Sequence, residues 1–251
     1  ATSFTTVTTT DGTVDLEVIV GNLTVGTAVT AGGSNNASLT TTTSGNVVLT
    51  GTTTAAGDQV MVTSAGSING AGLVTGSTID LNAVSGIGDT TQLELAGTAL
   101  TADTTNGNID IDNANAATAT YTTVTTGTGS ITVDNSGGGA AVFTTVTTTD
   151  GAVDLENIDD NLTATTVTAG GANDITLLTT TSGDITIDAI DATGNLVRIT
   201  SAGSIAENGD AGTDITAATT ALRAATGIGT DADSLDTVSS GTLTIAATTE
   251  S

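Results

Sequence analysis

Glycine-centred turn signals recur along this chain at an interval of about 22 residues, a period typical of stacked repeat units. This spacing limits the fold more than any other feature. A short run follows each turn in which Ile, Leu or Val alternates with Thr or Asp, as in 108–113 (NIDIDN) and 130–135 (SITVDN). Such alternation is the pattern of a half-buried β-strand. The turn glycines are Gly12, Gly45, Gly66, Gly86, Gly107, Gly129, Gly151, Gly183, Gly203, Gly227 and Gly241.

A repeat of this length with strands and turns predicts a parallel β-solenoid, an all-β fold of roughly 11 coils. One coil cannot bury its apolar face alone, so each stacks on the next at about 4.8 Å, giving a rod about 50 Å long. The window 217–225 is the only one with a helical pattern, and that pattern is weak. A β-sandwich is the alternative, but sandwiches do not usually repeat internally at the length of one coil.

A longer repeat is superimposed on the short one. The segment 5–17 (TTVTTTDGTVDLE) returns as 144–156 with a single change, from Thr13 to Ala152. We therefore expect one continuous solenoid over 1–251, made of two super-repeats, 4–142 and an incomplete second one over 143–251.

Three aromatic residues occupy the same place in the repeat, namely Phe4, Tyr121 and Phe143. Tyr121 and Phe143 are one coil apart, so we expect their rings to stack inside the solenoid.

The charge of the chain excludes several classes of partner. The net charge is −25, with 27 acidic residues against two arginines and no lysine. Binding nucleic acid or anionic membrane surfaces needs positive charge, so neither is expected. Cations, neutral glycans and protein surfaces, including other copies of this chain, are the expected partners.

Nothing in the sequence predicts insertion into a membrane, because no apolar run approaches the length that spans a bilayer. The chain contains no cysteine, so redox compartment cannot be inferred from it. The first residues (ATSF) have no leader pattern, and we expect any secretion signal to be removed or to lie outside this sequence.

Several segments resemble the repeats of filamentous-haemagglutinin-type exoproteins and related bacterial repetitive adhesins. They are 21–33 (GNLTVGTAVTAGG), 194–205 (GNLVRITSAGSI) and the run SGDITIDAI from Ser182. The resemblance covers nearly the whole chain, although the motifs are compositional. It implies a right-handed parallel β-helix that is secreted and acts at the cell surface, and it carries no catalytic residues.

The sequence does not predict an enzyme. Acidic pairs at alternate positions, such as Asp110 and Asp112 or Asp154 and Glu156, share one face of a strand. Two carboxylates could serve a polysaccharide-cleaving enzyme, but acids on an outer strand face are also the ordinary pattern of a soluble surface. The chain has no histidine or lysine to assist them.

Calcium is the one cofactor that the acidic residues suggest, and no cofactor is required by the fold. Hard oxygen ligands grouped in loops suit this ion. Candidate ligands are Asp231, Asp233 and Asp236 in a DxDxxD loop, together with Asp159, Asp160, Asp188 and Asp191 near predicted turns. Solvated turn acids are the alternative interpretation.

Threonine runs such as 122–126 and 144–149 could form a flat hydroxyl face of the kind that binds ice. This use requires Thr-x-Thr on successive coils, whereas the runs look uneven and are interrupted by Asp and Gly. We therefore expect threonine mainly to fill strand surfaces or to accept glycans.

Both ends of the chain read as uncapped strands. Joining the last residues, from Gly241, to the first, through Phe4, gives a run of the same length as the internal run from Gly107 to Tyr121. The sequence thus predicts head-to-tail stacking as an extracellular fibre or adhesin stalk, either between separate copies or between tandem repeats of a longer polypeptide. The expected assembly residues are Phe4, Thr5, Val7, Leu243 and Ile245. The alternative is a calcium-dependent adhesin or surface-layer component that binds glycans or cell-surface proteins.

Overall fold

The computed structural model confirms the all-β solenoid, with about 11 turns. It describes residues 1–251 apart from 210–211, 231–233 and 248–251. Every regular element in the described part is a strand, and together they form one sheet. The strands are β1 (Thr2–Thr8), β2 (Val14–Val20), β3 (Leu23–Thr30), β4 (Ala37–Ser44), β5 (Val47–Leu49), β6 (Thr52–Ser64), β7 (Ile68–Asn69), β8 (Val74–Ala83), β9 (Leu93–Ala96), β10 (Ala99–Thr104), β11 (Ile109–Asn113), β12 (Ala119–Thr128), β13 (Ile131–Asn135), β14 (Ala141–Asp150), β15 (Val153–Asp159), β16 (Leu162–Ala169), β17 (Ile175–Ser182), β18 (Ile185–Ser201), β19 (Ser204–Glu207), β20 (Ile215–Ala224), β21 (Gly227–Ile228), β22 (Thr237–Ser239) and β23 (Leu243–Ala247).

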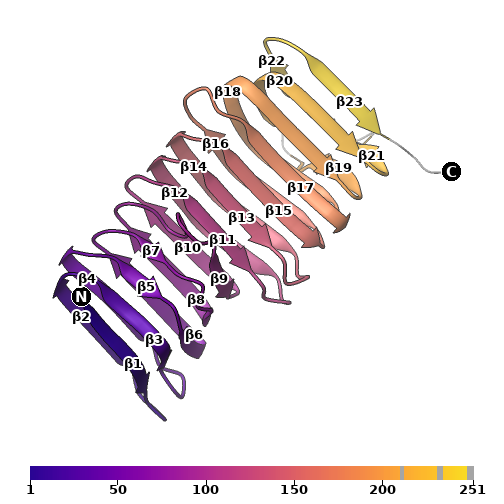
Figure 1. The fold of residues 1–251 in the computed structure, drawn as a ribbon. Coiled ribbons are helices and arrows are strands. Elements are labelled where there is room, and N and C mark those ends of the chain that lie inside the picture. Colours follow the sequence, from indigo (N-terminus) through magenta and orange to yellow (C-terminus); the bar gives the residue numbers. More distant parts are fainter. Residues whose placement is uncertain (210–211, 231–233, 248–251) are drawn as a thin grey trace.

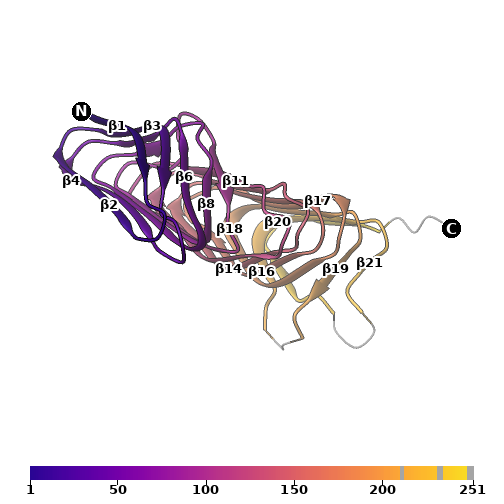
Figure 2. The ribbon, with the colours of Figure 1, turned by 90° about the horizontal axis from the view of Figure 1, so that it is seen from below.

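Parallel pairing between coils holds the rod together. Along one column, Ile131 pairs with Val153 and Val153 with Ile175, so equivalent residues of neighbouring coils lie side by side. Figure 1 shows the strands crossing the rod like rungs, with β1 and β2 at one end and β23 at the other. The two termini consequently lie at opposite ends, as the perpendicular view in Figure 2 also shows.

Each coil contributes to two walls that we name by their first strands. The first wall begins with β1 and β3, continues through β5, β7, β9, β11, β13, β15 and β17, and ends at β23. The second wall begins with β2 and β4, continues through β10, β12, β14, β16 and β19, and ends at β21 and β22. Strands β6, β8, β18 and β20 pass an edge of the rod and belong to both walls.

Several register shifts interrupt the walls, and the one within the repeated segment that contains Phe4 or Phe143 changes wall midway along the rod. In β1 the pairing skips Thr5, between Phe4 and Thr6 on the first wall. On the second wall Leu100 and Thr101 pair with Tyr121 and Thr123, so the skip enters there with β12. Because a bulge bends its strand, this particular bend lies on the first wall in β1 and on the second wall from β12 onward.

The two super-repeats are half a turn out of phase. Phe4 lies on the first wall, whereas Phe143, its counterpart in the second super-repeat, lies on the second wall. The side-chain bond from Asn35 to Asp11 (2.9 Å) recurs as the bond from Asn173 to Asp150 (2.9 Å), at the opposite edge of the rod. Equivalent segments therefore occupy opposite sides, which the sequence repeat alone does not reveal. The division into super-repeats 4–142 and 143–251 remains a prediction.

The interior is one aliphatic cluster that extends from Val14 to Ala224. The predicted aromatic stack is confirmed, since the rings of Tyr121 and Phe143 are fully buried with centroids 4.5 Å apart and planes 16° from parallel. Burial raises the pKa of the Tyr121 hydroxyl above its ordinary value. A solenoid with so few aromatics places two of them against each other.

A column of asparagines runs through this apolar interior. Asn113, Asn135 and Asn157 are fully buried on three successive coils. The amide of Asn135 donates to the Asn157 side chain (2.9 Å) and to the carbonyl of Gly139 (2.9 Å), and its oxygen accepts from the Tyr121 hydroxyl (3.1 Å). Buried amides are tolerated only when they are hydrogen-bonded, so this column fixes the edge turns to the core.

The predicted turn glycines meet two separate physical demands. Gly129 has a φ of 138°, a conformation that side chains rarely adopt. At Gly151 the demand is space, because an added Cβ would lie 1.9 Å from the carbonyl oxygen of Gly129 on the neighbouring coil. The helical reading of 217–225 is wrong, since β20 covers Ile215–Ala224 with inward residues alternating along it.

Candidate functional site: the two ends and the outer walls

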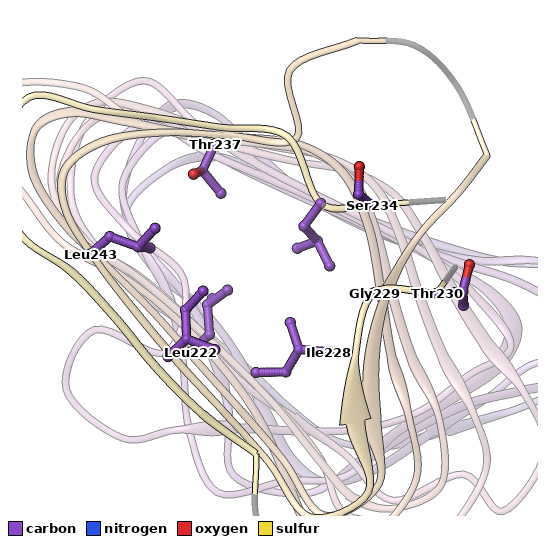
Figure 3. Close-up of a pocket in the computed structure, with 9 residues that line it drawn as sticks. Leu222, Ile228, Gly229, Thr230, Ser234, Thr237 and Leu243 are labelled. Carbon is purple, nitrogen blue, oxygen red and sulfur yellow. The ribbon is translucent and has the colours of Figure 1, made fainter. Parts of the chain in front are cut away.

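The C-terminal end of the rod exposes its apolar interior. A cavity of about 370 Å³ opens there, and Figure 3 shows Leu222, Ile228 and Leu243 pointing into it from different strands. Within the described residues β23 pairs with β20 alone, so its outer edge has no partner strand. Leu243 is 45% exposed and Ile245 is 55% exposed. Among the described residues, no further coil packs on the core side chains at this end.

At the N-terminal end, several inward-facing residues are likewise only partly covered. Phe4, Val7 and Leu16 face the core but are only partly buried. Their counterparts in the second super-repeat are fully buried, because β14 and β15 have coils on both sides. In the described part of the chain β1 pairs only with β3, and β2 only with β4. This end therefore also has room for one more coil.

The assembly residues predicted from the sequence all lie on these end faces. Phe4 and Val7 are inward residues of β1, whereas Thr5 occupies the exposed bulge position. Sequence reasoning missed Leu16 on β2 and Ile228 on β21, which complete the two faces. Alternation in 14–18 (VDLEV) could have identified Leu16, but Ile228 lies between turn signals where no pattern points inward.

A column of carboxylates runs along the outer side of the first wall. Cross-strand pairing joins Glu94 to Asp112, Asp112 to Asp134 and Asp134 to Glu156, one on each of four successive coils. The Gln92 amide donates to Asp134 of this column (2.9 Å) and to Asp110 of the neighbouring column (3.0 Å), which continues through Thr132 to Asp154. Like charges directly opposite one another destabilise a sheet, so cations near this wall would reduce the repulsion between its carboxylates.

Burial and the repulsion between carboxylates on this wall raise the pKa values of three of its acids, Glu94 in this column and Asp110 and Asp154 in the neighbouring one. Burial, together with the charge of Asp112, raises the pKa of Glu94. Burial also raises the pKa of Asp110, where the Gln92 hydrogen bond opposes it and the Asp134 charge adds to it. Partial burial followed by the charges of Asp134 and Glu156 raises the pKa of Asp154. These carboxylates are therefore easier to protonate than ordinary ones.

The residues predicted to bind calcium do not converge in the described part of the chain. Asp159 ends β15 and Asp160 follows it at one edge of the rod. Asp188 and Asp191 lie on β18 in the second wall, and Asp191 accepts hydrogen bonds from the Thr193 amide (2.9 Å) and hydroxyl (2.5 Å). Among described residues no group of three or more acids is placed to hold a metal ion.

The DxDxxD loop contributes one described acid. The amide of Asp236 donates to the Asp214 carboxylate (2.6 Å) near the C-terminal end. Asp231 and Asp233 lie outside the described residues, so calcium binding by this loop stays a prediction.

Threonines form a regular array on the outer side of the second wall. Two columns in register cross β12, β14 and β16: Thr123, Thr145 and Thr166, and Thr125, Thr147 and Thr168. The Thr125 hydroxyl donates to Asp103, whereas the other five hydroxyls make no hydrogen bond within the described residues. The expectation of uneven threonine runs is wrong for these three coils, because the bulge absorbs the irregular residue.

Comparison with known proteins gives no relative from which a role could be transferred. No protein-family model, no curated protein and no solved structure matches the chain. In the described residues, no helix is long and apolar enough to cross a membrane. The functional argument consequently starts from the ends and the walls themselves.

Proposed function

We propose that this chain is a structural rod, an extracellular fibre or adhesin stalk that lengthens by head-to-tail stacking of copies. The observation that carries the proposal is the pair of open end faces, each an unpaired strand edge beside exposed core residues. An exposed edge is a template for pairing with another chain. Stacking would continue the same ladder and aliphatic core across the joint.

The apolar residues at the ends supply the driving force. Joining two ends would bury Phe4, Val7 and Leu16 of one copy against Leu243 and Ile245 of the other. Full burial of one such side chain stabilises by about 1.5–3 kcal/mol, and new backbone pairing adds to it. The stack is heterologous and does not close on itself, so it grows into a filament.

Electron microscopy and sedimentation of the isolated chain test the proposal directly. We expect filaments at high protein concentration and their loss in Leu243→Lys, which places a charge in the joint. Val84→Lys is the matched control, because Val84 is equally exposed (45%) but lies within the rod. Single rods under all conditions, or equal effects of both variants, would contradict head-to-tail stacking.

A calcium-dependent adhesin or surface-layer component remains the alternative within the same class. The aligned carboxylates of the first wall support it, because multivalent cations reduce repulsion along such a column. Filaments that form only with calcium and dissolve in a chelator would favour this form of the proposal. Filaments indifferent to a chelator would favour a fibre held by strand pairing alone.

The threonine array favours one second candidate, binding to ice. Its hydroxyls repeat at about 4.8 Å between coils and roughly twice the residue rise along each strand, about 6.7 Å. The array is uncharged in a strongly acidic chain, and rigid pairing fixes its spacing.

The aromatic residues do not favour sugar binding by this wall. Phe4, Tyr121 and Phe143 face the core, so none of these rings is placed on the outer wall to stack on a sugar.

Freezing-point hysteresis and adsorption to ice test this candidate. Thr145→Lys at the centre of the array should abolish adsorption, whereas Thr176→Lys on the first wall should preserve it. Thr176 is a suitable control because it also points outward from a strand flanked on both sides. Absence of hysteresis in the unmodified chain would exclude ice binding.

A further inference from the structure

The internal duplication supplies a template for how two copies meet. The segment that carries β14 and β15 is the counterpart of β1 and β2, and it packs on β12 and β13. In that packing the bulged β14 lies on the second wall and the uninterrupted start of β15 lies on the first. An incoming copy presents the same pair of strands, a bulged β1 beside β2.

The receiving end has the same arrangement as this internal template. Its first wall finishes with the uninterrupted β23, paired residue by residue with β20. Its second wall finishes with two short strands, β21 and β22, that belong to separate halves of the wall. The interrupted wall at this end is thus the second, whereas at the N-terminal end it is the first.

We propose that a second copy stacks on this end after a half-turn about the rod axis, so that β1 lies on β21 and β22, and β2 lies on β23. This inference rests on the proposed head-to-tail assembly and specifies its geometry. Stacking without rotation would place the bulged β1 on the uninterrupted β23 and shift the register at Thr5, as happens where β12 meets β10. The half-turn instead places the bulged β1 on the interrupted second wall and the regular start of β2, from Val14 to Val18, on the regular β23.

The columns of paired residues then predict each contact across the joint. On the first wall the column through Ile199 and Leu222 ends at Ile245, and Leu16 of the incoming copy continues it. One step earlier, Val14 continues the column that ends at Leu243. Both pairs are apolar and face inward.

On the second wall the column through Ile205 ends at Ile228, and Thr2 of the incoming copy continues it. Phe4 is the next inward residue along the strand, so its ring lies over the open cavity of Figure 3, which Ile228 lines. The incoming phenylalanine therefore covers this cavity, as Phe143 covers Tyr121 inside the rod. Val7 takes the next inward place, over Thr237.

Disulfide trapping between copies tests the rotation, because the chain has no cysteine of its own. Paired residues on adjacent parallel coils have Cα atoms about 4.8 Å apart, within the range that a disulfide spans. A mixture of Leu16→Cys and Ile245→Cys chains reports the half-turn. A mixture of Phe4→Cys and Ile245→Cys chains reports stacking without rotation, because Phe4 would then continue the same column.

We expect oxidation of the first mixture to give crosslinked pairs at least tenfold in excess of the second, with each single variant alone as the background. The axial repeat of the filaments in electron micrographs should correspond to two chains. Filaments that crosslink only through Phe4, or that repeat with every chain, would overturn the half-turn and leave the fibre intact. Absence of both filaments and crosslinks would overturn the fibre as well.

Discussion

Removing one buried amide should disrupt three coils together. Asn135 is fully buried and makes hydrogen bonds to Tyr121, Asn157 and Gly139 at 2.9–3.1 Å, so Asn135→Ala leaves their polar groups without a partner in the core. Each unsatisfied buried group costs about 1–3 kcal/mol. Two or three such groups destabilise the fold by roughly 3–6 kcal/mol, at the upper end of the range for single substitutions.

Urea titration followed by tyrosine fluorescence measures this loss, because Tyr121 is the only tyrosine and the chain has no tryptophan. Asn115→Ala is the control, since Asn115 caps an exposed turn by accepting from the Ala117 amide (2.9 Å), and it should cost less than about 1 kcal/mol. In the double variant with Tyr121→Phe, followed by circular dichroism, we expect about 1–2 kcal/mol to be recovered. A loss below about 1 kcal/mol with no coupling to Tyr121 would refute the role of the asparagine column.

Two further predictions concern the acids and the turns. Folding raises the pKa values of Glu94, Asp110 and Asp154, so the folded chain binds protons at these carboxylates more tightly than the unfolded chain does. The resulting contribution to stability grows as pH falls through the raised pKa values and is lost as pH rises through them. Heat unfolding should therefore show a higher midpoint at about pH 4 than at about pH 7. Asp154→Asn should reduce that difference, and an unchanged difference would exclude the raised pKa of Asp154 as a source of it. Gly151→Ala should destabilise the fold by more than about 2 kcal/mol, because the added Cβ meets the Gly129 carbonyl. Gly227→Ala is the control: a Cβ at Gly227 meets no atom, so the variant should be neutral within about 1 kcal/mol. Equal urea midpoints for the two variants would contradict this account.

Most of the architecture could be predicted from periodicity, because alternation and turn spacing are local properties. Tyr121 stacks on Phe143 as their separation of one coil implies. The transfer of the bulge between walls was not predictable in the same way. It results from one extra residue, Thr122, between two inward positions, and such an insertion within a threonine run leaves no mark in composition.

The buried asparagines carried a signal that sequence reasoning overlooked. In 109–113 (IDIDN) and 131–135 (ITVDN) the final residue continues the inward alternation, and asparagine recurs at this place from one coil to the next. A polar residue at an inward position is easily read as the start of a turn. The strand pattern near both ends predicted β1 and β23, whereas the match of the two end faces after a half-turn depends on cross-strand register.

The orientation of the backbone ladder determines how this rod responds to tension. Hydrogen bonds between coils point along the rod, so a force that separates the two ends acts directly on the last coil rather than on all coils at once. Each coil contacts only its neighbours, and coils would detach one at a time. A released coil of about 22 residues yields about 70 Å of extended chain in place of about 4.8 Å of rod. Under load the released coils would lengthen more than tenfold by stepwise unravelling.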